Sequence, residues 1–219
     1  AVAFPGMYEE KPTVMLIMPP INNSNYVDAK DYFYTTMNVP LAEAGYYVLP
    51  PAATLATMQR ESAYDSERFI DGDVRRFGKI FGADVAIFTI IQGWEKSVIG
   101  SAVIIEIEYV FKSTKTNEVL YRRKARLNCD TSSNVRTNGL FGGLINLVAD
   151  AVKTAVTDYV SVAIMCNEQA LTDVPYGKYH PKYASTNNGL VKHTKVAVRI
   201  AYDLFETINN FTDSDKDLI

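Results

Sequence analysis

The most constraining feature of this sequence is a pair of central segments in which side-chain character alternates from residue to residue. In residues 103–112 one face holds only apolar and aromatic side chains: Val103, Ile105, Ile107, Tyr109 and Phe111. In residues 119–127 the basic side chains Arg122, Lys124 and Arg126 share one face. When Phe111 is placed opposite Val119, Glu108 opposes Arg122. In the same register Glu106 opposes Lys124, and each such pair contributes about 0.2–1 kcal/mol. The pattern predicts an antiparallel hairpin with one apolar and one solvated face.

Three shorter apolar runs predict strands that alternate with helices. The strands are 13–18, 46–49 and 84–91, and the helices between them are 28–44, 52–60 and 65–81. Pro40 is expected to divide the first helix, and residues 21–26 have the composition of a turn. Strands joined through helices lie parallel to one another. With the hairpin, the order predicts a single-domain α/β fold: a mixed five-stranded sheet packed by helices.

Later patterns and the ends of the chain set the expected domain boundaries. Residues 139–166 and 191–208 each carry an apolar stripe at helical spacing, and residues 167–189 are loop-like. We expect a flexible lead-in over 1–12, the α/β domain over 13–189, and a helical extension with a tail over 190–219. No run of about 18 apolar residues occurs, which a membrane-spanning helix would require.

The charge balance and the missing motifs exclude several functions. The chain has 22 basic and 25 acidic residues, a net charge of −3, which argues against an electrostatic grip on nucleic acid. It contains no glycine-rich phosphate-binding motif and no GxSxG nucleophile motif. The two histidines and two cysteines do not have the spacing of a metal site. We therefore expect no cofactor, no metal and no catalytic residues.

Two groups of residues leave room for an enzyme. Glu106 and Glu108 share one strand face, as a two-carboxylate site requires, although opposing basic residues explain them more simply as a salt-bridged surface. His180 lies in the loop PYGKYHPKY and is a candidate general base, or else a residue that pins the loop. A hydrolase with an unrecognised site is therefore kept as an alternative.

The tyrosine content is the most unusual part of the composition. Of the 14 tyrosines, several fall in expected loops or helix starts: Tyr26, Tyr32, Tyr34, Tyr176, Tyr179 and Tyr183. Tyrosine offers a large amphipathic contact area, so these side chains either form an interface or cap the core of their own domain. The candidate interaction surface combines the start of the 139–148 helix with the PYGKYHPKY loop: Leu140, Phe141, Leu144, Tyr176, Tyr179, His180 and Tyr183.

The two cysteines have two interpretations. Cys129 and Cys166 could form a disulfide that closes a loop of about 37 residues, a constraint worth roughly 3–4 kcal/mol. Alternatively they are small buried apolar side chains.

Several segments together resemble a family of bacterial lipoproteins of unknown function, one member of which is a meningococcal surface lipoprotein. They are MLIMPPINNSNYVDAK, YTTMNVPLAEAGYYVLP, FGADVAIFTII, GLFGGLINLVADAVKTAV and PYGKYHPKY, in this order. The resemblance covers about residues 12–185, and LAEAGYYV and YGKYHPKY are its most specific parts.

The resemblance implies properties that composition does not. A lipidated cysteine would precede Ala1, and the protein would face the periplasm from the outer membrane of a bacterial envelope. The fold would resemble the N-terminal domain of TolB and the periplasmic domain of CsgG. Members tend to be encoded beside a CsgG-like lipoprotein, which suggests a shared envelope or secretion assembly. The expected partners are further copies of this chain and another envelope lipoprotein. An adaptor that activates a cell-wall synthase is the alternative. An oxidising periplasm would favour the disulfide.

Overall fold

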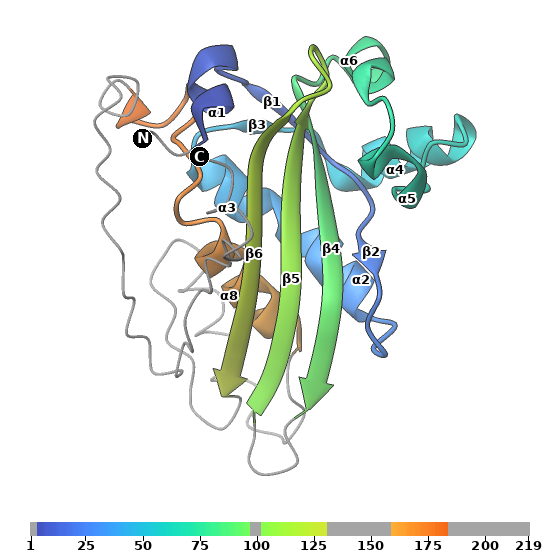
Figure 1. Ribbon diagram of the computed structural model, residues 1–219, viewed down its shortest axis with the longest axis vertical. Helices are drawn as coiled ribbons and strands as arrows, with labels where there is room; N and C mark the ends of the chain where they lie inside the picture. Colours follow the sequence, from blue (N-terminus) through green and yellow to red (C-terminus); the bar gives the residue numbers. More distant parts are fainter. Residues whose placement is uncertain (1–3, 97–101, 131–158, 184–219) are drawn as a thin grey trace, which may run out of the picture.

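The structure, a computed structural model, describes residues 4–96, 102–130 and 159–183 of the 219-residue chain. Its centre is a mixed sheet of six strands (Figure 1). Five of them follow the order β3-β1-β4-β5-β6, and the sixth, β2, pairs with β4 farther along that strand than β1 does. The strands are β1 (Val14–Ile17), β2 (Ile21–Asn22), β3 (Tyr47–Val48), β4 (Val85–Lys96), β5 (Ala102–Ser113) and β6 (Val119–Asp130). The first four are parallel where they pair, and β4, β5 and β6 are antiparallel. The expected single α/β domain with a mixed sheet is confirmed.

The expected count of five strands is wrong, because residues 21–22 form a strand rather than part of a turn. Pro19 and Pro20 cannot donate ladder hydrogen bonds, so they interrupt the first strand. The chain then returns to the sheet, where Ile21 pairs with Ile90 on β4. A two-residue strand of this kind has no periodicity that a sequence pattern can detect.

Helices cover both faces of the sheet. They are α1 (Pro5–Glu10), α2 (Ala29–Thr36), α3 (Asn38–Glu43), α4 (Pro51–Arg60), α5 (Glu67–Ile70), α6 (Arg75–Phe81) and α8 (Tyr159–Ala170). The helices α2 and α8 pack against each other and lie behind the three long strands in Figure 1. The helices α4, α5 and α6 lie near the upper part of β4. The first expected helix is split as predicted, but at Met37 rather than at Pro40.

The expected flexible lead-in is wrong for residues 5–10, which form α1. Pro5 occupies the first turn, where its missing N–H costs nothing, and Met7 is 3% exposed. The Glu10 carboxylate accepts hydrogen bonds from the hydroxyls of Ser113 (2.6 Å) and Thr116 (2.8 Å) at the β5–β6 turn. Six residues carry too few apolar positions to reveal this docking in the sequence.

The hairpin has the predicted faces but a different register. Phe111 pairs with Tyr121, not with Val119, because Leu120 is an extra residue where the register shifts. The structure therefore places Lys124 opposite Glu108. A shift of two residues keeps the side chains from Tyr121 onward on their predicted faces, so this part of the apolar face is buried as expected, whereas Val119, beyond the extra residue, is 48% exposed.

The opposite face of the hairpin is only partly solvated. Val110 and Lys112 are buried on the side of the sheet that holds the α5–α6 region. The Lys112 ammonium group donates to the carbonyls of Ile70 (3.0 Å) and Gly72 (2.7 Å). Burial lowers the pKa of Lys112 despite the neighbouring acidic side chains. On β5 the expected solvated face is therefore buried at these two positions, whereas Arg122, Lys124 and Arg126 on β6 are exposed.

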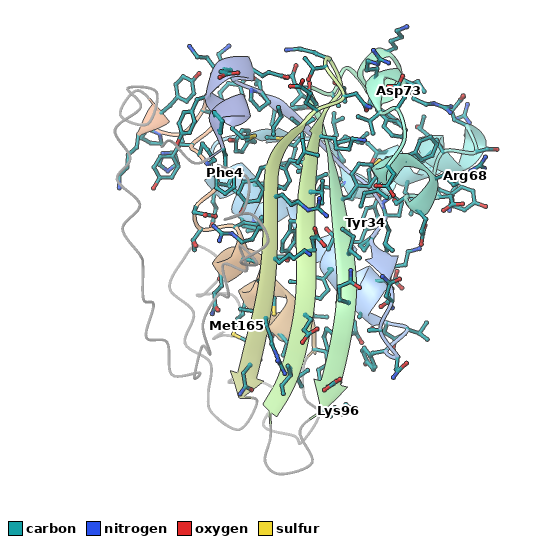
Figure 2. All side chains as sticks on the ribbon, in the orientation of Figure 1. Phe4, Tyr34, Arg68, Asp73, Lys96 and Met165 are labelled. Atoms are coloured by element: carbon teal, nitrogen blue, oxygen red, sulfur yellow. The ribbon has the colours of Figure 1, made fainter. Side chains whose placement is uncertain are left out.

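The last described helix, α8, packs its inner side on the sheet. Figure 2 shows Met165 on this helix behind the lower part of β6. Its buried residues are Val162, Ala163, Met165, Cys166, Asn167 and Ala170. The rest of the expected 139–166 helix and the expected 191–208 helix lie outside the described residues. Among the helices that the structure describes, none has the length and apolar character needed to cross a bilayer.

Candidate interaction surface

The segment that follows α8 is held against the turn between α3 and β3. The N–H of Gly177 donates to the carbonyl of Ala44 (2.7 Å), and the N–H of Tyr179 donates to the carbonyl of Gly45 (3.0 Å). Farther in, the buried Tyr46 hydroxyl donates to the carbonyl of Pro175 (2.5 Å). Three hydrogen bonds thus fix residues 174–183, which we call the docked segment, to one rigid turn.

Two facing glycines make this approach possible. Gly45 has φ +88°, and a Cβ atom there would lie 2.3 Å from the backbone nitrogen of His180. A Cβ atom on Gly177 would lie 2.5 Å from the Gly45 carbonyl oxygen. Gly45 is therefore required both for its backbone angle and for its lack of a side chain.

The docked segment contains four of the predicted surface residues. The rings of Tyr176 and His180 stack with 3.7 Å between centroids, and both are half-buried. Tyr179 is 64% exposed and is accompanied by Lys178, whose ammonium group lies 6.0 Å from the ring centroid. Tyr183 ends the described segment and is half-buried. The segment presents Tyr179 to solvent on a base of stacked rings.

The other predicted surface residues are not placed. Leu140, Phe141 and Leu144 lie outside the described residues, so their proximity to the docked segment stays a prediction.

The remaining loop tyrosines cap the core of their own domain. The rings of Tyr26 and Tyr32 pack against Trp94, at centroid distances of 5.0 Å and 6.4 Å. The Tyr34 hydroxyl donates to the carbonyl of Pro51 (2.9 Å). These three tyrosines therefore fit the interpretation that they cap the core. The interface interpretation applies only to the tyrosines of the docked segment.

His180 has the contacts of a residue that pins a loop. Its Nδ1 atom accepts a hydrogen bond from the N–H of Lys182 (3.0 Å), and its ring is committed to Tyr176. Partial burial and the charge of Lys182 lower its pKa, so the imidazole is neutral at pH 7. These contacts stabilise the docked segment.

The candidate carboxylate pair is neutralised by arginines. Glu108 accepts from Arg122 Nε (2.5 Å), with Lys124 Nζ 3.9 Å away, and Glu106 lies 3.3 Å from Arg126 Nε. A shallow hollow of about 660 Å³ lies elsewhere, between α6 and the β5–β6 turn, and neither glutamate nor His180 lines it. In the part of the chain that the structure describes, the two glutamates therefore have the contacts of ion-pair partners.

The cysteines meet inside the core. Cys129 on β6 and Cys166 on α8 are both buried, with 3.8 Å between their sulfur atoms. Burial raises the pKa of Cys166, whereas the hydrogen bond with Cys166 lowers the pKa of Cys129. Within the described residues no cluster of three or more histidine, cysteine or acidic side chains could hold a metal ion.

The sequence patterns missed a buried polar network beside the cysteines. The Tyr109 hydroxyl donates to Asn167 Oδ1 (2.6 Å), and Asn167 Nδ2 donates to the Thr36 hydroxyl (2.9 Å). The network joins β5, α8 and α2 where all three side chains are buried. Asn167 falls in a segment that is expected to be a loop, so its sequence context does not indicate a buried hydrogen-bonding role.

Comparisons with known proteins agree on one group. Residues 3–177 match the profile of a family described as "Putative lipoprotein GNA1162-like". Over 152 residues the chain is 24% identical to "Putative lipoprotein NMB1124/NMB1162" of Neisseria meningitidis serogroup B, covering 68% of this chain and 70% of that protein. None of these descriptions names a catalytic activity.

Two solved structures are also similar. The crystal structure of lipoprotein GNA1162 from Neisseria meningitidis has a TM-score of 0.50 and 22% identity, covering 64% of this chain and 95% of that one. It therefore supports the fold. The PelC dodecamer from Paraburkholderia phytofirmans has a TM-score of 0.45 and 10% identity, covering 74% of this chain and 88% of that one.

Proposed function

The chain belongs to the GNA1162-like lipoprotein family, and from this premise we propose that it is a lipid-anchored protein of the bacterial envelope that acts by binding other proteins. In this proposal a lipidated cysteine precedes Ala1, and the domain faces the periplasm from the outer membrane. The α/β domain includes α1 and extends to residue 189, and residues 190–219 add a helical extension. The fold is expected to resemble the N-terminal domain of TolB and the periplasmic domain of CsgG.

The position of α1 supports a short attachment. Phe4 packs on Tyr121 with 4.4 Å between ring centroids, so the chain already contacts β6 at its fourth residue. Three extended residues span at most about 10 Å. A lipid attached just before Ala1 would then hold the α1 end of the domain close to the membrane. The lipid also raises the effective concentration of partners on the same surface.

The docked segment is the observation that carries the proposal of protein binding. Its backbone is fixed by Gly45 and Tyr46, and it holds the exposed Tyr179 ring on an ordered base. A segment whose backbone is already fixed loses little conformational entropy when a partner covers the aromatic side chain that it carries. The partners we propose are further copies of this chain and another envelope lipoprotein of a CsgG-like assembly.

The test compares two exposed tyrosines in full-length, lipidated protein. Tyr179→Ala removes the proposed contact, whereas Tyr64→Ala removes a tyrosine of similar exposure, 53% against 64%, beyond α4. Crosslinking in cells and solution mass of the purified protein are measured for both variants. We expect Tyr179→Ala to lose the crosslinked species at least tenfold and Tyr64→Ala to retain them.

Four results would count against the proposal. A strict monomer without any crosslinked partner would refute protein binding, and equal losses in both variants would exclude the docked segment as the contact. Capture of a peptidoglycan polymerase in place of a lipoprotein would favour the synthase adaptor instead. Recovery of the protein from the soluble fraction, without a lipidated N-terminus, would refute the anchor.

A further inference from the structure

The two cysteines occupy positions that are suited to a covalent link between α8 and the sheet. Cys129 lies on the buried face of β6, and Cys166 lies on the inner side of α8. Their sulfur atoms are 3.8 Å apart, already in direct contact. Rotation of the two side chains has to shorten this distance by about 1.8 Å to reach the length of a disulfide bond. The chain contains no other cysteine.

Neighbouring contacts hold the pair in place. The residue after Cys166 is Asn167, whose amide bonds both Tyr109 and Thr36 in the core. One turn later the Tyr121 hydroxyl donates to the carbonyl of Ala170 (3.2 Å). Because α8 is fixed to β5 and β6 at these points, the thiols meet at a high effective concentration in the folded chain.

We propose that Cys129 and Cys166 form a disulfide that fastens α8 to β6, and that an exchangeable disulfide such as oxidised glutathione is the oxidant. The link would fix the base from which the docked segment extends, because that segment follows α8 directly. The proposal rests on the proposed envelope location for its oxidising surroundings, but its chemistry belongs to the folded chain alone.

The order of the two steps follows from exposure. Cys129 is 6% exposed, whereas Cys166 is fully buried, so an incoming disulfide reaches Cys129 first. The Cys129 thiolate attacks one sulfur of oxidised glutathione, which forms a mixed disulfide and releases one glutathione thiolate. The Cys166 thiolate then attacks the Cys129 sulfur and releases the second glutathione thiolate. The two protein protons pass through solvent to the released thiolates, and the protein pair is oxidised as glutathione is reduced.

The test measures oxidation of the full chain in glutathione buffers of fixed ratio. The reduced chain is equilibrated either folded or in denaturant, quenched with acid, unfolded and treated with iodoacetamide. Mass spectrometry then counts the alkylated thiols. We expect the folded chain to have an oxidised-to-reduced ratio at least about tenfold higher than the unfolded chain. The oxidised species is lighter by two hydrogen masses, carries no alkyl group and yields one peptide that links Cys129 to Cys166.

A single-cysteine variant tests the order of attack and supplies a control. Cys166→Ser lacks the resolving thiol, so glutathione should accumulate on Cys129 as a mixed disulfide. A folded wild-type chain that keeps two alkylatable thiols would overturn the proposal, as would equal ratios in the folded and unfolded states. The folded sample is reduced and reoxidised without being unfolded, so its oxidised-to-reduced ratio does not depend on refolding. Neither the membrane nor a partner enters this test, so its failure is distinct from failure of the proposed function.

Discussion

The buried network of Tyr109, Asn167 and Thr36 allows a sharp test of what holds α8 in place. Tyr109→Phe removes one hydroxyl and leaves the Asn167 side-chain oxygen without its donor. Asn167→Leu keeps a similar volume but leaves the Tyr109 hydroxyl without an acceptor. All three side chains are at most 6% exposed, so water cannot replace the lost partner without disturbing the core.

The expected losses follow from the cost of a buried, unpaired polar group. Such a group destabilises a protein by about 1–3 kcal/mol, so we expect each single variant to lose about 2 kcal/mol of unfolding free energy. The double variant Tyr109→Phe with Asn167→Leu removes both members of the bond and leaves neither unpaired. It should therefore lose less than the sum of the two single variants, by about 1–2 kcal/mol.

Urea unfolding followed by far-UV circular dichroism measures these losses. With an m-value of about 2 kcal/mol/M, each single variant should lower the midpoint by about 1 M. Tyr64→Phe is the matched control, since its ring is 53% exposed and its midpoint should not change measurably. The reasoning is refuted if Tyr109→Phe behaves like Tyr64→Phe, or if the double variant loses the full sum.

Three further predictions concern other parts of the fold. Gly45→Ala should release the docked segment and make it more sensitive to limited proteolysis. Gly82→Ala, at φ +66° with open space around its Cβ position, should cost only about 1 kcal/mol and leave proteolysis unchanged. Met7→Ala should lower the free energy of unfolding by about 2–4 kcal/mol, measured by thermal denaturation, because α1 is part of the folded domain. A negligible loss would show that α1 does not contribute to the core. Burial of Asp84 opposes its ionisation, but bonds from the N–H groups at the start of β1 and from Lys115 outweigh burial and lower its pKa below 3.8. The stabilising contribution of Asp84 is therefore complete above pH 3.8 and is lost as the pH falls through the lowered pKa. Asp84→Asn should make the free energy of unfolding, measured by urea titrations at a series of pH values, depend less on acid pH.

Local patterns in the sequence predicted the parts of the fold that depend on them. The period-two alternation determines which hairpin side chains are buried, and the helices between apolar runs determine that β1, β3 and β4 are parallel. The register was wrong because it depends on where the chain accommodates Leu120, and cross-strand charge pairing gave no information on that point. α1 was missed because a six-residue helix is stabilised by what it packs against, not by its own sequence.

The candidate site was predictable as a set of residues but not as a geometry. The aromatic loop is visible in the sequence, and Tyr176, Tyr179 and His180 do lie together. Its partner in the fold, the turn around Gly45, is more than 130 positions away and has no local pattern that points to it. The cysteines were recognised as a pair only because the chain has two, and their contact depends on how α8 packs on β6.

The link between α8 and the docked segment joins the proposals into one physical argument. Between Asn167 and Tyr179, the chain is tied to the sheet and the α3–β3 turn by hydrogen bonds at five positions: Asn167, Ala170, Pro175, Gly177 and Tyr179. Each tie removes conformational freedom before any partner arrives, so the entropy cost of binding at Tyr179 is reduced. A disulfide at Cys166, one residue before the first of these five positions, would add a covalent tie between α8 and β6. Loosening α8 should therefore weaken binding at Tyr179 although the Tyr179 side chain itself is unchanged. Asn167→Leu is the variant in which stability and partner crosslinking should fall together.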